Sequence, residues 1–586
     1  MLSASAISQL QQWLNEHQFD AFFIPHEDEY LGEYTGDDQA RLAWATGFTG
    51  SAGVAILAAD GMHLFVDGRY TLQAQAQSPA CHQHHLIETP PLTWLSEHLA
   101  QGRIAIDPRL HSANWLEQAQ KLSQFEWQSL AQNPIDQLWH DRPAANLSAV
   151  ECFAERYTGQ SSLSKRQQIG AQLQQSKLDA VLLTQADSIA WLLNIRGRDI
   201  PCVPVALSHA LINRAGEVSW FIDPSRLPED WQQHVGEGVQ CFAPEQLAEQ
   251  LAQLSGQVIG FDPQQSNAWC QQHLQAAGAQ LVDYGDPCVL PKACKNEVEL
   301  TGMRDCHVRD GVAMVKFLHQ LDRQVADGVE LNEALLSDQL WQIRQLDNSC
   351  LEPSFDTISA AGSNAAMCHY NHNNSDQPAT LQQGEVYLVD SGAQYIDGTT
   401  DITRTVAIGE CDAQVKRAFT LVLKGHIAIA TARFPQGLTG AQLDPLARQF
   451  LWANGMDFDH GTGHGVGHRL GVHEGPQRIS KAGTAELKAG MVISNEPGYY
   501  RSNGFGIRIE NLEVVVPVHV DGDRPTLGFS SLTRAPIDSR LIARELMTDA
   551  EIAWLNDYHK TVWHTLSPLL DDAADRDWLA QATQAI

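Results

Sequence analysis

The chain has 586 residues, a formal net charge of −31 at pH 7 and 43% hydrophobic residues. This length indicates several domains, and the hydrophobic fraction is sufficient for ordinary folded cores. The strong negative charge makes nucleic acids and anionic membranes unsuitable partners, because their phosphates would be repelled.

The eleven cysteines are scattered, odd in number and without a C-x-x-C pair, which argues against a disulfide framework or a zinc ribbon. This pattern suits a reducing compartment, so we expect a cytoplasmic protein. The first basic residue is Arg41, and we therefore expect no signal or transit peptide. No apolar run approaches the length of a transmembrane helix.

The first half of the chain contains an internal repeat at an offset of about 150 residues. Chance similarity between apolar strands is the alternative explanation, but four matches in the same order argue against it. The matching pairs are FDAFFIPHEDEY (19–30) with LDAVLLTQADSI (178–189), LAWATGF (42–48) with IAWLLNI (189–195), FVDGRY (65–70) with WFIDPSR (220–226), and GRIAIDPRLHSANWL (102–116) with QVIGFDPQQSNAWC (257–270).

Each copy of the repeat opens with an amphipathic helix and then alternates strands and helices, which predicts two similar α/β domains. We place these domains at residues 1–145 and 146–294, with linkers near 141–148 and 286–297. A helix from Glu297 to about Leu321 is expected to open the third domain, residues 295–586.

The third domain contains two predicted strand pairs with acidic residues near their turns. GEVYLVD alternates apolar and polar residues and predicts a strand ending at Asp390, and DITRTVAIG predicts a second strand starting at Asp401. The turn-rich segment between them predicts a hairpin that brings the two aspartates close. VISNEPG and GIRIENLEVVVPV repeat this arrangement, with Glu496 and Glu510 on the two arms.

His464 lies between the two hairpins in the glycine-rich segment HGTGHGVGH, whose glycines make a helix unfavourable. Taken alone, an aspartate at a strand end is usually a turn cap, and a histidine among glycines is usually structural. Four carboxylates and one imidazole, each in its own glycine-rich motif, instead have the ligand chemistry of two divalent cations that share a water. Without metal, the clustered like charges would raise some of the carboxyl pKa values.

These motifs resemble the pita-bread metallopeptidases, a group that contains methionine aminopeptidase, prolidase, creatinase and aminopeptidase P. DSGAQYIDGTTDITRT, HGTGHGVG, HEGP and EPGYY are most similar to aminopeptidase P, the Xaa-Pro aminopeptidase, and ELMTDAEIAWLNDYHKTV resembles the end of its long, three-domain form. The resemblance implies two creatinase-like α/β domains followed by a pita-bread catalytic domain, in which two αβ halves surround a curved antiparallel sheet. One departure is that His468 and Arg469 follow GVG, where a small or apolar pair is expected.

The resemblance also implies ligand roles. Asp390 would bind one metal through both oxygens, Asp401 and Glu510 would bridge two metals, and His464 and Glu496 would complete the second ion. Manganese is the metal that the family leads us to expect, although Co²⁺ and Zn²⁺ suit the same ligands. Glu496 would contact the attacking water and carry its proton to the leaving nitrogen.

Three further histidines, His369, His460 and His473, are placed around the metals by the family motifs. His369 and His473 would assist catalysis by donating hydrogen bonds to the carbonyl oxygen and the oxyanion, and all three rings would line the proline site. Arg508 precedes Glu510 by two residues, so we expect it to point into the site, either as a charge partner or substrate clamp or as a purely structural salt bridge. Arg69 is expected to contact substrate, the alternative being a surface arginine at a strand end.

The predicted function is a metal-dependent aminopeptidase that hydrolyses the N-terminal Xaa-Pro bond of peptides and, as the resemblance suggests, acts as a homodimer. Prolidase, which cuts Xaa-Pro dipeptides, is the nearest alternative, and a non-catalytic pita-bread binding module is the second. Such modules characteristically lose metal ligands, whereas this chain has all five. G-x-S-x-G and the P-loop motif are absent, which argues against serine hydrolases and nucleotide-dependent enzymes, and H-E-x-x-H is absent as well.

Overall fold

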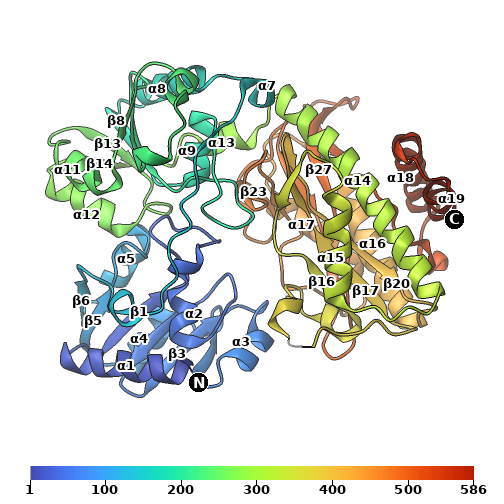
Figure 1. Ribbon diagram of the computed structural model, residues 1–586, viewed down its shortest axis with the longest axis horizontal. Helices are drawn as coiled ribbons and strands as arrows, with labels where there is room; N and C mark the ends of the chain where they lie inside the picture. Colours follow the sequence, from blue (N-terminus) through green and yellow to red (C-terminus); the bar gives the residue numbers. More distant parts are fainter. Residues whose placement is uncertain (1, 376) are drawn as a thin grey trace. The chain divides into compact units, whose positions relative to one another are not determined.

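The computed structural model describes residues 2–375 and 377–586 (Figure 1). The chain divides into two compact units, Met1–Cys288 and Val289–Ile586. Within the described residues, no helix combines the length and the apolar character needed to cross a bilayer. The eleven cysteines are all free thiols.

The first unit contains two six-stranded sheets with the same topology. In each sheet two antiparallel pairs form the centre and parallel strands form the outer positions. The first sheet has the order β4 (His82–His85), β3 (Gly61–Val66), β2 (Val54–Ala58), β1 (Ala21–Pro25), β5 (Gly102–Ile106), β6 (Phe125–Ser129). The second has the order β12 (Val239–Phe242), β11 (Val218–Phe221), β10 (His209–Asn213), β8 (Ala180–Leu183), β13 (Val258–Phe261), β14 (Gln280–Asp283).

The helices of this unit follow the repeat as well. Helices α1 (Leu2–Glu16) and α8 (Ser162–Gln175) open the two copies. Ser112 caps α5 (Ala113–Gln120) and its counterpart Asn267 caps α12 (Ala268–Ala276), and these two caps pair with each other in an antiparallel bridge. The prediction of two similar α/β domains is therefore confirmed. The other helices are α2 (Arg41–Thr46), α3 (Thr71–Gln77), α4 (Pro91–His98), α6 (Pro134–Leu138), α7 (Glu155–Thr158), α9 (Ala186–Leu193), α10 (Trp231–Val235) and α11 (Leu247–Ala252), and β7 (Glu151–Cys152) pairs with β9 (Ile195–Arg196).

The second unit is built on antiparallel strands. A six-stranded sheet has the order β21 (Arg433–Pro435), β28 (Thr526–Ser531), β27 (Asn511–Val518), β24 (Val492–Asn495), β22 (Gly463–Gly465), β23 (Glu474–Ile479). Two three-stranded sheets have the orders β16 (Ile358–Ala361), β17 (Val386–Ser391), β20 (Ile402–Ala407) and β15 (Cys350–Pro353), β18 (Ala393–Tyr395), β19 (Gly398–Thr399). A hairpin joins β25 (Gly498–Arg501) to β26 (Phe505–Arg508).

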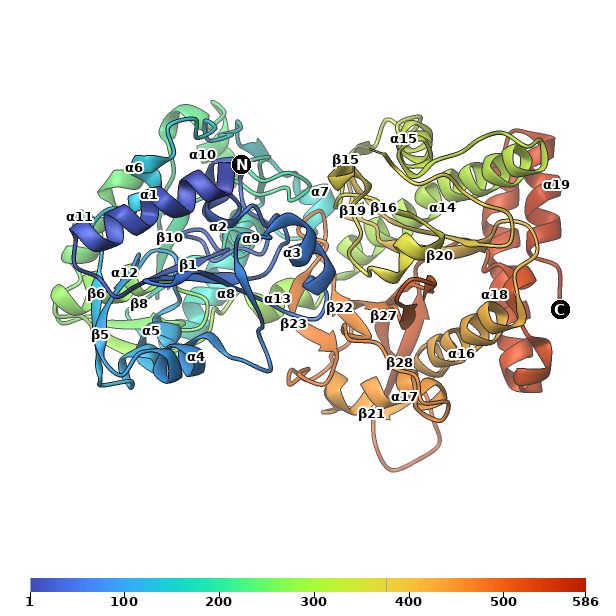
Figure 2. The ribbon, with the colours of Figure 1, turned by 90° about the horizontal axis from the view of Figure 1, so that it is seen from below.

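Helices cover these strands from two sides (Figure 2). From α14 (Glu297–Ala326), Phe317 packs with Tyr387 and Val389 of β17, in a core shared with α15 (Glu333–Arg344). From α17 (Gly440–Trp452), Leu443 packs with Ile493 of β24, in a core shared with α16 (Ala413–Ala430). This arrangement of two αβ halves agrees with the pita-bread expectation. The remaining helices are α13 (Val289–Ala293), α18 (Asp549–Leu566) and α19 (Ala573–Ala582).

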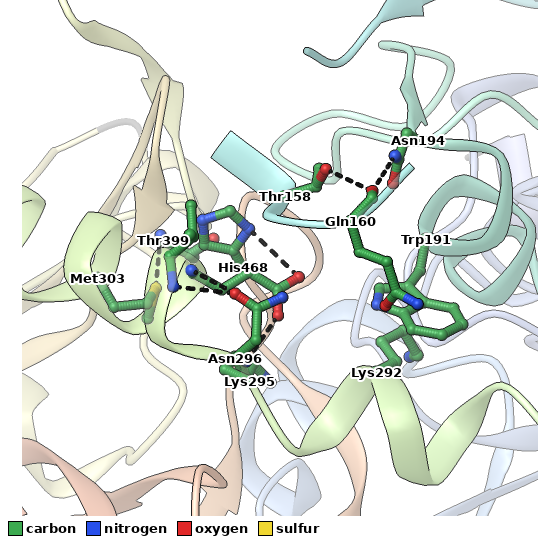
Figure 3. A network of polar contacts seen from close by, with 12 residues as sticks. Thr158, Gln160, Trp191, Asn194, Lys292, Lys295, Asn296, Met303, Thr399 and His468 are labelled. Carbon is green, nitrogen blue, oxygen red and sulfur yellow. Dashed lines mark hydrogen bonds and ion pairs between the residues drawn. The ribbon is translucent and has the colours of Figure 1, made fainter. Parts of the chain in front are cut away.

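The start of α14 agrees with its predicted position at Glu297, although the helix continues beyond Leu321 to Ala326. Its capping box is formed by Asn296 and Glu299, which exchange hydrogen bonds with each other's backbone N–H. The ring of His468 lies beside this cap, with its Nδ1 atom 4.0 Å from Glu299 Oε1 (Figure 3). The unexpected histidine after GVG thus lies against the first turn of α14.

Candidate metal centre

The predicted hairpin brings Asp390 and Asp401 to neighbouring strands. Strands β17 and β20 pair antiparallel, and Asp390 lies opposite Thr403, two residues after Asp401. The connection between them is more ordered than the expected loop, because β18 and β19 pair with each other and β18 also pairs with β15. Backbone pairing of the hairpin therefore fixes the separation of the two carboxylates.

The second pair of carboxylates is positioned by the six-stranded sheet. Strands β24 and β27 pair antiparallel, with Asn495 opposite Asn511. Glu496 directly follows β24 and Glu510 directly precedes β27. The two glutamates consequently flank one end of the same strand pair, and the β25–β26 hairpin lies between them in the chain. They do not lie on the arms of one hairpin as predicted, because the expected strand GIRIENLEVVVPV is divided into β26 and β27.

His464 lies on β22, which confirms that its segment is not helical. Its Nε2 atom is 3.4 Å from Asp401 Oδ2 and 3.5 Å from Glu496 Oε1. Its Nδ1 atom faces the carbonyl oxygen of Gly465 at 2.9 Å. When Nδ1–H donates to that carbonyl, the lone pair of Nε2 faces the carboxylates, which is the tautomer that a metal ligand needs.

The glycines around His464 are required by close backbone packing. A Cβ atom on Gly463 would lie 1.9 Å from the carbonyl oxygen of Ser494 in the neighbouring strand β24. The hydroxyl of Ser494 accepts from the backbone N–H of His464 and donates to Glu496 Oε1. The tight approach of β22 to β24 therefore holds the imidazole and the glutamate in one place.

Several oxygen atoms in this cluster are buried without a hydrogen-bond partner in the described chain. They are Oδ1 of Asp390, Oδ1 of Asp401 and Oε1 of Glu510. Buried polar atoms in folded proteins nearly always have a partner, and a group of three unpaired carboxylate oxygens suits a bound cation. One ligand atom each from Asp401, His464 and Glu510 lies within 4.8 Å of the others. The residues present therefore fit a divalent metal centre.

The pKa values of the cluster reflect the same crowding. Burial raises the pKa of Asp401 to about 6, and the negative charges of Asp390 and Glu496 add to this effect. Burial, followed by the charge of Asp401, raises the pKa of Glu510 well above its usual range. Burial opposes the charged form of His464, but hydrogen bonding to Asp401 and the charge of Glu496 raise its pKa to about 9. Burial is the largest cause of the carboxyl shifts, and the mutual charges of the cluster are the next.

Arg508 points into the cluster from the end of β26. Its Nη2 atom donates to Oδ2 of Asp390, and its Nε atom donates to the hydroxyl of Thr403 at 3.1 Å. Its Nη1 atom donates to the hydroxyl of Tyr500 at 2.6 Å and to the carbonyl of Cys368 at 3.3 Å. Arg508 is therefore a charge partner of one ligand carboxylate and a tether for two neighbouring segments.

The three further histidines lie in the same unit but at different places. The ring of His473 meets the ring of His464 edge to face, with centroids 4.3 Å apart. The Nε2 atom of His460 lies 2.8 Å from the hydroxyl of Tyr500. His369 is half-buried and directly follows Cys368, the residue whose carbonyl accepts from Arg508.

Arg69 lies in the first unit, where its guanidinium forms a salt bridge with Asp67 at 2.7 Å. This contact within the sequence VDGRY is what a strand-end arginine would make, and a substrate contact by Arg69 stays a prediction.

Three polar partners in the site were not predicted from the sequence. Tyr500 joins His460 to Arg508, Ser494 supports Glu496, and Thr403 donates to Oε2 of Glu510 at 2.8 Å. Tyr500 stands in EPGYY and Thr403 in DITRT, so both belong to the motifs that indicated the ligands. The signal was present, but the sequence does not show which hydroxyl turns inward.

Comparison with known proteins gives family matches along the whole chain. Creatinase/Prolidase N-terminal domain models match residues 7–138 and 141–299, the model of Metallopeptidase family M24 matches 301–517, and the C-terminal region of peptidase M24 matches 525–586. A probable Xaa-Pro aminopeptidase P from Laccaria bicolor is 38% identical, over 98% of this chain and 92% of the relative.

Similar solved structures agree with these family matches. An X-prolyl aminopeptidase from Caenorhabditis elegans, described as a cytosolic enzyme with a di-nuclear active site, is 32% identical with a TM-score of 0.96 and covers 100% of both chains. An Xaa-Pro dipeptidase from Bacillus anthracis is 22% identical with a TM-score of 0.51, and the match covers 64% of this chain and 99% of that one. The second similarity shows a shared fold.

Proposed function

The chain belongs to the Xaa-Pro aminopeptidase P group of metallopeptidase family M24, and we propose that it removes the first residue from peptides whose second residue is proline. It is a hydrolase of the metallopeptidase class. The observation that carries this function is the cluster of Asp401, His464 and Glu510, whose ligand atoms converge within 4.8 Å, in a chain that matches its relatives from end to end.

We propose that this site holds two divalent ions, with Mn²⁺ as the native metal. We assign the five residues Asp390, Asp401, His464, Glu496 and Glu510 as their ligands, with Asp401 and Glu510 shared by both ions. Metals bound there would activate a water molecule and polarise the carbonyl of the scissile bond. The unpaired buried carboxylate oxygens and the oxygen-rich donor set support this assignment.

The side chains around the ligands handle protons and position the substrate. Glu496 is held by the hydroxyl of Ser494 through Oε1, and we assign it to take the proton of the attacking water and deliver it to the leaving imino nitrogen. His369 and His473 donate to the substrate carbonyl as it gains negative charge. His460 joins them in lining the proline site, where the tertiary amide has no N–H to satisfy.

Arg508 and Arg69 complete the residues that we propose to contribute to substrate binding. Arg508 is already engaged by Asp390 and Tyr500, so its contribution to binding is through the position of those groups. A direct contribution of Arg69 is tested by an Arg69→Gln variant, for which the KM for peptide should rise while kcat changes little. An unchanged KM would remove Arg69 from the substrate site.

The domain arrangement and the setting of the enzyme complete the proposal. We propose that the three domains extend over residues 1–145, 146–294 and 295–586, that the enzyme is cytoplasmic, and that it acts as a homodimer without nucleic-acid or membrane partners. The family matches support the domains, and the cytosolic C. elegans relative and eleven free thiols support the location. Light scattering coupled to size-exclusion chromatography tests the dimer.

The alternatives are disfavoured by separate observations. A prolidase is disfavoured because a relative that is 38% identical over 98% of this chain is a probable Xaa-Pro aminopeptidase P. A non-catalytic binding module is disfavoured because the chain keeps all five ligand residues.

The deciding experiment compares kcat/KM for Arg-Pro-Pro, Arg-Ala-Pro, N-acetylated Arg-Pro-Pro and Gly-Pro with the manganese-loaded enzyme. We expect rapid cleavage of Arg-Pro-Pro, slow cleavage of the alanine and acetylated peptides, and loss of activity with chelator that manganese reverses. Equal rates on the proline and alanine peptides would indicate a general aminopeptidase, and activity on Gly-Pro alone would indicate prolidase. Full activity in metal-free protein would contradict the metallopeptidase mechanism.

A further inference from the structure

Four histidines and one aspartate gather at the β4 edge of the first sheet, in the N-terminal unit. Asp60 lies in the turn between β2 and β3, His63 lies on β3, and His98 is the last residue of α4. His82 and His84 lie on the edge strand β4, which pairs parallel with β3 so that His82 is opposite His63. This cluster has no part in the proposed peptidase chemistry.

We propose that Asp60, His63 and His98 form a binding site for a divalent transition metal, with zinc as the preferred ion. The Oδ1 atom of Asp60 lies 3.1 Å from His63 Nε2 and 3.2 Å from His98 Nε2. All three ligand atoms lie within 4.8 Å of one another. A tetrahedral zinc site with bonds of about 2.0–2.1 Å separates neighbouring ligand atoms by about 3.3 Å, so the donors already have suitable spacing.

The second ring nitrogen of the inner ligand, His63, has a partner that can fix its tautomer. Its Nδ1 atom lies 3.1 Å from Nε2 of His84, and its side chain is 5% exposed. When Nδ1–H donates to His84, the lone pair of Nε2 is directed to the side where Asp60 and His98 lie.

Ring packing holds the histidines in place. The ring of Trp94 lies 4.2 Å from that of His63 and stacks on that of His98 at 4.3 Å, measured between centroids. The ring of His82, on the neighbouring strand β4, stacks on the ring of His63 with centroids 4.7 Å apart. Side chains fixed in this way lose little conformational freedom on binding an ion, which favours affinity.

The site is open to solvent on one side, because the side chains of Asp60 and His98 are 49% and 31% exposed. Water can therefore fill a fourth coordination position, and an ion has an entry path. The net charge of −31 raises the local concentration of cations around the protein. A bound ion would connect the end of α4 to the β2–β3 turn and stabilise the N-terminal domain.

The same distances also suit a metal-free arrangement in which both imidazoles donate to Asp60. The metal-bound and metal-free arrangements differ in zinc uptake and in the chemical reactivity of His98. These two properties are therefore measured on the full-length enzyme. The variants are His98→Gln and Asp60→Asn, which change solvent-exposed side chains. The matched control is His85→Gln, because His85 lies on β4 but on the face opposite to His82 and His84.

Zinc bound per chain is measured by elemental analysis after dialysis at micromolar free zinc. We expect the wild type and His85→Gln to bind one zinc ion more than His98→Gln or Asp60→Asn, with circular dichroism spectra unchanged. In parallel, zinc should protect His98 of the wild type from modification by diethyl pyrocarbonate, as read by peptide mass spectrometry. Equal zinc contents in all four proteins, or undiminished modification of His98 in zinc, would overturn the site in favour of the hydrogen-bonded arrangement.

Discussion

Arg508 donates through Nη2 to Oδ2 of Asp390, and both side chains are buried in the C-terminal unit. Asp390 is also one of the carboxylates that we assign to metal. A metal bound there would therefore share the negative charge of Asp390 with the guanidinium. This shared charge makes the effect of an Arg508 substitution depend on whether metal is bound.

Replacing Arg508 with methionine leaves the buried carboxylate of Asp390 without its guanidinium partner. We expect the free energy of unfolding in chelator to fall by about 3–5 kcal/mol, the usual cost of removing one partner from a buried ion pair. With manganese the loss should be smaller, because the metal charge replaces the guanidinium. Urea unfolding with chelator and with manganese measures both values. Arg501→Met, an exposed position on the same hairpin, is the control, and equal destabilisation in both conditions would contradict the coupling.

Variants of the metal ligands should lose metal, whereas variants of the assisting residues should keep it. Asp401→Ala and Glu510→Ala should lose metal as well as activity, because each carboxylate is assigned to both ions. His369→Ala should keep a near-normal metal content while kcat falls by about 10²–10³, the effect of a lost oxyanion donor. Elemental analysis and initial rates on the same preparations provide the test. A metal-free His369→Ala protein would show that His369 is a ligand instead.

Tyr500 connects two parts of the site through one hydroxyl, which lies 2.8 Å from His460 Nε2 and 2.6 Å from Arg508 Nη1. Tyr500→Phe keeps the ring and removes this link. A lost hydrogen bond to a charged group is worth about 1.5–3 kcal/mol, so we expect kcat/KM for Xaa-Pro peptides to fall at least about tenfold.

Metal content of Tyr500→Phe should stay unchanged, because no ligand is removed. Tyr499→Phe is the matched control, since this neighbour packs against the hydrophobic core and should tolerate the loss of its hydroxyl. Loss of metal from Tyr500→Phe would mean that the hydroxyl supports the ligands through Arg508 rather than the proline site through His460.

Much of this organisation was predictable because local patterns determine it. Alternating strands with turn residues between them predicted that Asp390 and Asp401 share a hairpin, and the repeat predicted two similar α/β domains, which the two matching sheets confirm. Contacts between distant segments were not predictable in this way. Thr403 and Glu510 meet across 107 residues, and Asp60 and His98 across 38. No periodic sequence pattern indicates either contact, because the packing of whole strands and helices brings these residues together.

His559, on α18, illustrates a group whose burial the sequence pattern does not indicate. It is fully buried, and its Nε2 atom accepts from the backbone N–H of Ile537 at 3.1 Å. Burial, followed by the charge of Arg404, lowers its pKa to about 4. The unfolded chain takes up a proton on this ring below about pH 6.5, whereas the folded protein does so only near its lowered pKa.

The contribution of His559 to stability is therefore complete above about pH 6.5 and is lost as the pH falls through this window. At pH 5 the loss should be about 2 kcal/mol. Glutamine cannot take up this proton, and its side-chain oxygen can accept from Ile537, so His559→Gln should lose less stability than the wild type between pH 7 and pH 5. Urea unfolding in chelator at both pH values removes any effect of metal release. His564→Gln, an exposed position on the same helix, should behave like the wild type, and an equal pH response in His559→Gln would show that His559 does not titrate in this range.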